Sequence, residues 1–153
     1  MKIGIISDTH GFLDPKVPGL FAGVSRILHA GDIGPDSIIA ELEAVAPVTA
    51  VLGNTDSSAI FRLTETVTLA GRKFLIHHIV NPRELPEPLR LRIARERPAV
   101  VVYGHTHRAG WLALDGVGYL NPGYAGRPKS GAERSVAILH CDGTELRPEF
   151  LPL

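Results

Sequence analysis

The chain has 153 residues, of which 44% are hydrophobic and 21% are charged, so it can bury a core and we expect a single domain, residues 1–153. The 16 basic residues balance the 16 acidic ones, and this net charge of zero gives little attraction for long DNA or RNA. The single cysteine, Cys141, cannot form an internal disulfide, and no apolar run approaches the roughly 20 residues needed to cross a membrane. The chain also begins without a charged leader and a cleavable apolar segment, so we expect a cytoplasmic protein without a membrane anchor.

The first third of the chain predicts strands that alternate with helices. Short apolar runs at 2–6, 26–30 and 48–52 read as buried strands. A segment interrupted by Pro18 and Gly19 predicts a short or irregular helix, and Pro35 is suited to the first turn of an amphipathic helix that Pro47 ends. Because strand, helix and strand in this order form a βαβ unit, the three strand ends should lie side by side at one edge of a sheet.

The remainder of the chain predicts mostly strands and turns. The expected elements are strands at 66–70 and 73–78, a helix at 89–97, a strand at 99–102 and hairpins at 111–120 and 135–150. The arginines of the helix read as a solvated face, on which Arg92 and Glu96 are spaced for an i to i+4 ion pair. The glycines and prolines of 123–131 predict an exposed, mobile loop.

Polar side chains stand where the predicted strands end, which is where open α/β sheets bind ligands. The collected candidates are Asp8, His10, Asp32, Asn54, His77, His105 and His107. His105 and His107 are two residues apart and would share one side of an extended chain. An isolated pair of this kind is more often made of ordinary loop or core histidines. With the upstream residues, however, it forms a set of O and N donors for two divalent ions about 3.5–4 Å apart, which Asp32 could bridge.

The order of these motifs resembles the calcineurin-like metallophosphoesterase superfamily. The resemblance rests on Asp8-x-His10, Gly31-Asp32, Gly53-Asn54-x-Asp56, His77 and Gly104-His105-x-His107. The short length and the turn Asn121-Pro122-Gly123 are similar to its small bacterial and archaeal phosphodiesterase branch. The resemblance implies an α/β fold in which two mixed β-sheets form a sandwich flanked by helices. It further implies that Asp8, His10, Asp32 and His107 hold one metal ion and that Asp32, Asn54, His77 and His105 hold a second. Asp32, Asn54 and His105 are then the expected catalytic residues.

The function implied by this resemblance is a phosphodiesterase that hydrolyses small phosphate esters through a hydroxide bridging two metal ions. Mn²⁺ is the expected cofactor, with Ni²⁺, Co²⁺, Fe²⁺ and Zn²⁺ as alternatives. The expected partner is a small phosphate ester. The sequence is also compatible with association into a homo-oligomer. Two other hypotheses are a non-catalytic metal-binding scaffold, as in a retromer subunit of similar fold, and a nuclease, which would need a basic track that the sequence lacks.

Several residues depart from the family pattern or have uncertain roles. Thr55 stands where the phosphatase branches carry a histidine that protonates the leaving group, and a hydroxyl is a poor acid. His78 replaces the usual glycine, and it could be the missing acid or merely fill space on the face opposite His77. Tyr124 replaces a serine and should alter only the rim of the pocket.

Two further residues are expected to support the metal ligands. Asp56 should accept a hydrogen bond from a ligand imidazole and fix its orientation. His29 could act in a similar way or could be a core histidine with satisfied hydrogen bonds.

Overall fold

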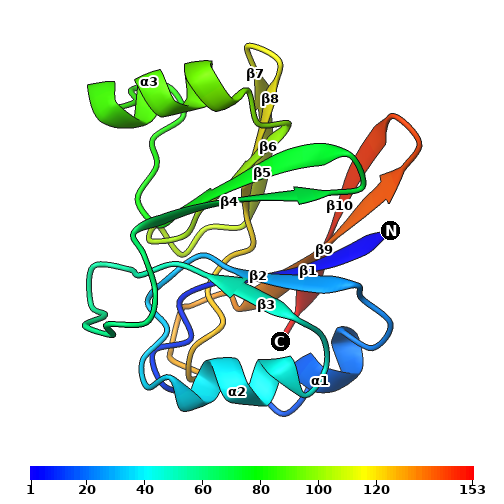
Figure 1. Ribbon diagram of the computed structural model, residues 1–153. Coiled ribbons are helices and arrows are strands. Elements are labelled where there is room, and N and C mark those ends of the chain that lie inside the picture. Colours follow the sequence, from blue (N-terminus) through cyan, green and yellow to red (C-terminus); the bar gives the residue numbers. More distant parts are fainter.

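Two five-stranded sheets pack face to face, and helices cover the outer face of each (Figure 1). The computed structural model describes residues 1–153. From the top of Figure 1 downward the layers are a helix, the second sheet, the first sheet and two short helices. This is the sandwich of two mixed sheets that the family resemblance implies.

The first sheet has the strand order β10-β9-β1-β2-β3. Its strands are β1 (Lys2–Ile6), β2 (Arg26–His29), β3 (Val48–Ala50), β9 (Ser135–Asp142) and β10 (Glu145–Pro152). The strands β1, β2 and β3 are parallel neighbours, as the βαβ pattern predicts, whereas β9 pairs antiparallel with both β1 and β10. The carboxyl ends of three strands therefore meet at one edge.

The second sheet has the strand order β4-β5-β6-β8-β7. Its strands are β4 (Thr64–Leu69), β5 (Arg72–His77), β6 (Val100–Val102), β7 (Gly110–Leu114) and β8 (Val117–Asn121). The central strands β5, β6 and β8 are parallel, and the outer strands β4 and β7 join them through tight antiparallel hairpins.

Three helices lie on the outer faces: α1 (Val17–Leu20), α2 (Ser37–Glu43) and α3 (Glu87–Glu96). The helix α2 is shorter than its apolar pattern suggests. Pro35 belongs to a turn that precedes the helix, in which the Ile38 N–H donates to the Pro35 carbonyl at 3.1 Å. No helix is long and apolar enough to span a membrane.

Alternation along the strands decides which side chains enter the core between the sheets. In β5, Phe74 and Ile76 are buried in that core, whereas Leu75 packs on the opposite face in the cluster that includes Leu89 and Ile93 of α3. Both faces of β5 are therefore apolar, and a run of three apolar residues does not reveal which face a following residue will join.

The loop at 123–131 is only partly exposed, contrary to expectation. Residues 123–126 are buried, and residues 127–131 are exposed. The Arg134 guanidinium holds the buried part in place, because it donates from Nε to the Gly126 carbonyl at 2.7 Å and from a terminal nitrogen to Asp14 Oδ2 at 2.8 Å.

Candidate metal centre

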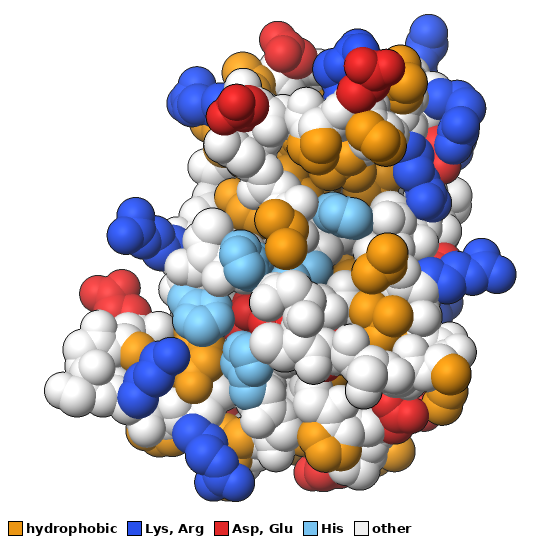
Figure 2. Space-filling view, turned by 90° about the vertical axis from the view of Figure 1, so that its left-hand side faces the viewer, with side chains coloured by type: hydrophobic (Ala, Val, Ile, Leu, Met, Phe, Trp, Pro, Cys, Tyr) orange, Lys and Arg blue, Asp and Glu red, His pale blue; other side chains and the backbone are white.

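The candidate ligands come from loops at one edge of both sheets. Asp8 and His10 follow β1, Asp32 follows β2, Asn54 follows β3, His78 follows β5, and His105 and His107 follow β6. Figure 2 shows the histidines gathered on one face of the molecule, with an acidic side chain visible between them.

The side chains form two clusters. Asp8, His10 and His107 make the first cluster, and Asp32, His78 and His105 make the second; within each, the potential ligand atoms lie within 4.8 Å of one another. Asp32 joins the two clusters, because its Oδ2 lies 3.6 Å from His10 Nε2 and 3.3 Å from His78 Nε2. This is the position expected of a bridging carboxylate.

Each buried carboxylate has one oxygen anchored by the backbone and one directed at imidazoles. Asp8 Oδ2 accepts from the His105 N–H at 3.2 Å, and Asp8 Oδ1 has no hydrogen-bond partner. Asp32 Oδ1 accepts from the Thr55 N–H at 2.9 Å. Burial favours the neutral form of Asp32, but hydrogen bonds from Thr55 and the nearby His78 and His10 outweigh it and lower its pKa. Asp32 is thus held as an anion.

His78 presents an imidazole lone pair to these carboxylates. Its Nδ1 lies 2.7 Å from the Ala30 carbonyl, which can only accept, so Nδ1 carries a proton, and in the neutral ring Nε2 is the atom with the free lone pair. Nε2 is buried without a hydrogen-bond partner, 3.3 Å from Asp32 Oδ2 and 3.9 Å from Asp8 Oδ1. A lone pair that faces carboxylate oxygens needs a cation between them. The residues therefore fit a divalent metal ion.

His77 does not join either cluster, contrary to the ligand set expected from the sequence. It is half-buried on the other face of β5, where its Nδ1 lies 2.8 Å from Thr64 Oγ1, and burial lowers its pKa. Alternation places His78 on the same side as Phe74 and Ile76, toward the first sheet. His78 thus occupies the place expected of His77, beside Asp32 and His105.

The loops at the site adopt a backbone conformation that is rare for residues with a side chain. Asp8, His10, Asp32, His105 and His107 all have positive φ, between 46° and 67°. Each such residue costs roughly 1–2 kcal/mol, and such strain concentrates at functional sites. The Gly104 to His107 segment is therefore not extended, and its two histidines turn to different clusters.

Two further contacts hold the histidine loop against the first sheet. A Cβ at Gly104 would overlap Ser7 Oγ and Asp8 Oδ2, so only glycine allows this approach. Asn121 Nδ2 donates to the Gly104 carbonyl and to Thr106 Oγ1, both at 3.0 Å. The sequence indicated only a turn at Asn121, because its partners are distant in the chain.

Asn54 lies beside the second cluster, where the sequence predicts it. Its amide Oδ1 accepts from His105 Nδ1 at 3.0 Å, and its Nδ2 has no hydrogen-bond partner within the protein. The Thr55 backbone lies against Asp32, as described above.

Asp56 orders backbone rather than an imidazole, contrary to expectation. Its carboxylate accepts from the N–H groups of Ile33 at 2.9 Å, Gly34 at 3.1 Å and Gly53 at 2.8 Å. Asp56 thereby ties the loop that carries Asp32 to the loop that carries Asn54.

Of the two alternatives given for His29, the structure favours a core histidine with satisfied hydrogen bonds. It is fully buried, and its Nδ1 accepts from the Gly31 N–H at 3.2 Å, so Nε2 carries the proton and donates to Thr9 Oγ1 at 3.0 Å. The Thr9 hydroxyl in turn donates to the Ile33 carbonyl at 2.8 Å. Burial lowers the pKa of His29 to about 3, and the neutral ring links the strand β2 to the site loops.

Comparison with known proteins decides the family. The family described as "Calcineurin-like phosphoesterase superfamily domain" matches this chain over residues 1–144. The chain belongs to the calcineurin-like phosphoesterase superfamily.

Relatives in this superfamily match nearly the whole chain. A probable metallophosphoesterase of Methanothermobacter thermautotrophicus is 36% identical over 161 residues, which cover 99% of this chain and 92% of the relative. The phosphodiesterase YfcE of Escherichia coli (strain K12) is 31% identical over 93% of this chain and 89% of its own. The crystal structure of wild-type Vps29 complexed with Zn²⁺ from Entamoeba histolytica has the same fold, with a TM-score of 0.76, 20% identity and 99% of each chain covered.

Tyr124 gives this calcineurin-like chain an aromatic wall at the first cluster. The ring stacks on His107 with centroids 4.7 Å apart and an interplanar angle of 24°, and the hydroxyl donates to the Arg127 carbonyl at 3.0 Å. Burial lowers the pKa of His107. Tyr124 therefore contacts a candidate ligand directly, beyond the rim position expected from the sequence.

Proposed function

We propose that the chain is a phosphodiesterase that depends on two divalent metal ions and hydrolyses small phosphate esters. The observation that carries the proposal is the pair of buried atoms without hydrogen-bond partners, Asp8 Oδ1 and His78 Nε2, which lie 3.9 Å apart where the two clusters meet. The relatives named phosphoesterase and phosphodiesterase support the same class of reaction. The core shared by both sheets supports one domain for residues 1–153.

The residues divide between two metal ions. We assign Asp8, His10, Asp32 and His107 to the first and Asp32, Asn54, His78 and His105 to the second. Mixed carboxylate, amide and imidazole donors suit Mn²⁺, and also Fe²⁺, Co²⁺, Ni²⁺ and Zn²⁺. His78 takes the role that the family resemblance implies for its neighbour His77.

The side chains of the site supply charge and orientation for attack on phosphorus. Two bound divalent ions supply an acidified water and positive charge for the phosphate oxygens. Asp8 and Asp32 keep fixed positions because backbone N–H groups hold one oxygen of each. The Asn54 Nδ2 group, which has no partner within the protein, can donate to a phosphate oxygen and stabilise charge that develops there.

Neither Thr55 nor His78, the two residues considered for this role, is placed to protonate the leaving group. Thr55 contributes its backbone N–H to Asp32, and the one N–H of His78 is used by the Ala30 carbonyl. Esters with acidic alcohols need little protonation, so we propose that the enzyme prefers good leaving groups such as nitrophenols.

The test is hydrolysis of bis(p-nitrophenyl) phosphate by protein supplied with Mn²⁺, with metal content measured on the same preparation. We expect turnover in the wild type and loss of at least about 1,000-fold in Asp32→Asn, since the metals are a principal source of catalysis. The control Asp36→Asn alters an exposed carboxylate of the adjacent turn and should keep full activity. Metal binding without turnover under Mn²⁺, Ni²⁺, Co²⁺ and Zn²⁺ would overturn the enzyme proposal.

A metal-binding scaffold is the second candidate, and exposed apolar side chains favour it. Ile60 and Leu63 are 72% and 64% exposed on the loop that follows Asn54, and Ile79, which follows His78, is 47% exposed. Figure 2 shows apolar side chains beside the histidines on this face. If the scaffold is correct, partner binding should be lost in Leu63→Asp while metal content is unchanged.

A further inference from the structure

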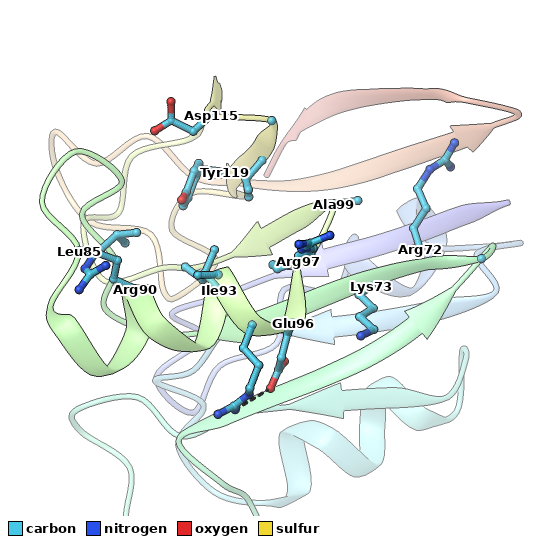
Figure 3. A pocket seen from close by; sticks show the side chains of 16 residues that line it. Arg72, Lys73, Leu85, Arg90, Ile93, Glu96, Arg97, Ala99, Asp115 and Tyr119 are labelled. Atoms are coloured by element: carbon cyan, nitrogen blue, oxygen red, sulfur yellow. Dashed lines mark hydrogen bonds and ion pairs between the residues drawn. The ribbon is translucent and has the colours of Figure 1, made fainter.

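A groove of about 1050 Å³ lies between α3 and the β7–β8 hairpin, at the opposite end of the second sheet from the metal centre (Figure 3). Its lining comes from the starts of the parallel strands β5, β6 and β8, whereas His78 and His105 follow the ends of β5 and β6. A strand of six residues such as β5 spans about 20 Å, so the groove and the metal centre are separate.

The groove exists because one helix cannot cover the outer face of the second sheet. Five strands are about 24 Å wide, whereas a helix with its side chains is about 10 Å wide. The helix α3 packs over Leu75 and Val101, and Leu112, Leu114 and Val117 beside it stay only half-buried. Ile93 and Tyr119 form part of the apolar lining.

The lining of the groove contains both paired and unpaired charged side chains. Arg95 and Glu96, which form an ion pair, belong to it, as does Arg72, which donates to the Gly143 carbonyl. Arg92 and Arg95 bind Glu96, at 3.0 Å and 3.4 Å. Arg90, Arg97 and Lys73 line the groove and have no carboxylate within ion-pair distance. In Figure 3, Arg90 lies beside Leu85 at one end of the groove, and Arg97 lies toward Lys73 at the other, with Ile93 between them. The helix face that the sequence predicts to be solvated thus carries two arginines that are paired with Glu96 and two, Arg90 and Arg97, that have no carboxylate partner.

Tyr119 supplies a hydrogen-bond donor that nothing in the protein uses. The side chain lines the groove and its residue is only 4% exposed, yet its hydroxyl makes no hydrogen bond within the protein. The hydroxyl is accessible at the surface of the groove, because the only buried side-chain polar atoms without a partner are Asp8 Oδ1 and His78 Nε2. Burial, with a smaller contribution from Asp115, raises the pKa of Tyr119, so the phenol keeps its proton and can donate it to an acceptor.

We propose that this groove binds a phosphorylated organic small molecule, with its phosphate at Arg97 and Lys73 and its ring or other apolar part against Ile93 and Tyr119. The groups without a partner in the protein are three exposed cations and a phenol, and their donors favour a ligand that carries negative charge. An inorganic anion would leave the apolar lining unused. Asp115, an exposed carboxylate of the lining without an ion-pair partner, lies on the wall opposite α3, where it can accept from a hydroxyl or amine of the ligand (Figure 3).

The probe is ADP, titrated into metal-free protein in EDTA so that neither metal binding nor hydrolysis contributes. Calorimetry should give a dissociation constant below about 1 mM, and backbone amide shifts should change at Val117 and Ala99 and not at Gly31 or Asn54. Inorganic pyrophosphate, which has the same anion without the ring, should bind at least about tenfold more weakly.

Two variants test individual contacts to the ligand, and a third serves as a control. Arg97 has φ 50°, a conformation that glycine adopts freely, so Arg97→Gly removes the guanidinium without disturbing the end of α3. This change should weaken ADP binding at least about tenfold, the effect of one charge-assisted hydrogen bond. Tyr119→Phe should weaken it about threefold to tenfold with an unchanged melting temperature, because the hydroxyl has no partner to lose. Arg147→Gln, at an exposed arginine of β10 that is not part of the lining, should have no effect.

Three results would contradict the proposal. The first is no heat of binding with several millimolar ADP. The second is equal affinity for ADP and pyrophosphate, which would remove the apolar part of the site. The third is an equal loss in Arg97→Gly and Arg147→Gln, which would mean that the protein attracts the anion through diffuse charge rather than through a built groove.

Discussion

Changing His78 to alanine should remove the second metal ion, whereas the same change at the adjacent His77 should leave both ions in place. The two residues share a backbone and a residue type and differ in the face that they join. His78 is 3% exposed and directs its Nε2 at Asp32 and Asp8, whereas His77 contacts Thr64 on the far side of β5. The pair is therefore a matched test of which histidine is the ligand.

The size of the effect follows from the composition of the second cluster. His78 is one of three residues in that cluster with a titratable donor, together with Asp32 and His105. Loss of a group that merely orients a ligand lowers metal affinity about 10–100-fold, so loss of the ligand itself should cost at least about 100-fold, or about 3 kcal/mol. The Ala30 carbonyl also loses its donor, which should destabilise the metal-free protein by about 1–3 kcal/mol. His77→Ala loses one half-buried hydrogen bond, worth about 1 kcal/mol.

The assay is metal content by mass spectrometry after dialysis against limiting Mn²⁺, with bis(p-nitrophenyl) phosphate hydrolysis on the same samples. We expect one ion per chain and little activity in His78→Ala, and two ions with near-normal activity in His77→Ala. Melting temperatures in EDTA establish that both variants are folded. Two ions in His78→Ala together with one in His77→Ala would refute the assignment.

Three further predictions concern stability. Metal removal with EDTA should lower the melting temperature of the wild type by about 5–10 °C, since a ligand at about 100 times its Kd contributes about 2.7 kcal/mol; an unchanged value would contradict a bound metal. The pKa of the His29 imidazole falls from 6.5 to about 3 on folding, so between pH 6.5 and pH 3 only the unfolded chain binds a proton at this ring. The free energy of unfolding in EDTA should therefore decrease as pH falls below 6.5, by up to about 1.4 kcal/mol per pH unit. Urea unfolding at pH 5 and pH 7 checks this dependence, which should be weaker in His29→Gln. Asp56→Ala should destabilise the protein by about 2–4 kcal/mol, because three backbone N–H groups lose their acceptor, whereas the exposed Asp36→Ala should stay within about 0.5 kcal/mol.

Much of the candidate site could be predicted because its residues follow strands. The sheet edge that collects Asp8, Asp32 and Asn54 is a consequence of parallel strand pairing, which the alternation of apolar runs and helices indicates. The bridging place of Asp32 also follows from residue chemistry, since a carboxylate has two oxygens to share. These inferences need only local sequence and the general rules of α/β sheets.

The choice between His77 and His78 could not be made in this way. The preceding residues Phe74, Leu75 and Ile76 are all buried, because the second sheet contacts the first on one side and α3 on the other. An apolar run of this kind carries no alternation from which to assign a face. The hydrogen-bond partners of Asp56 could not be predicted either, because the N–H groups of Ile33 and Gly34 lie 23 and 22 residues away in the chain.

The sequence by itself determined the family, through the order of its motifs, and the inventory of oxygen and nitrogen donors around His105 and His107, because these depend on residue type and on where strands end. The sandwich of two mixed sheets was implied by the resemblance to that family. The tertiary structure alone decided how the donors are distributed. Positive φ values turn His107 toward Asp8 and His105 toward Asp32, and packing on both faces of β5 places His78 rather than His77 beside the carboxylates. Side-chain direction depends on backbone conformation and on which face meets the core, and both are properties of the assembled sheets.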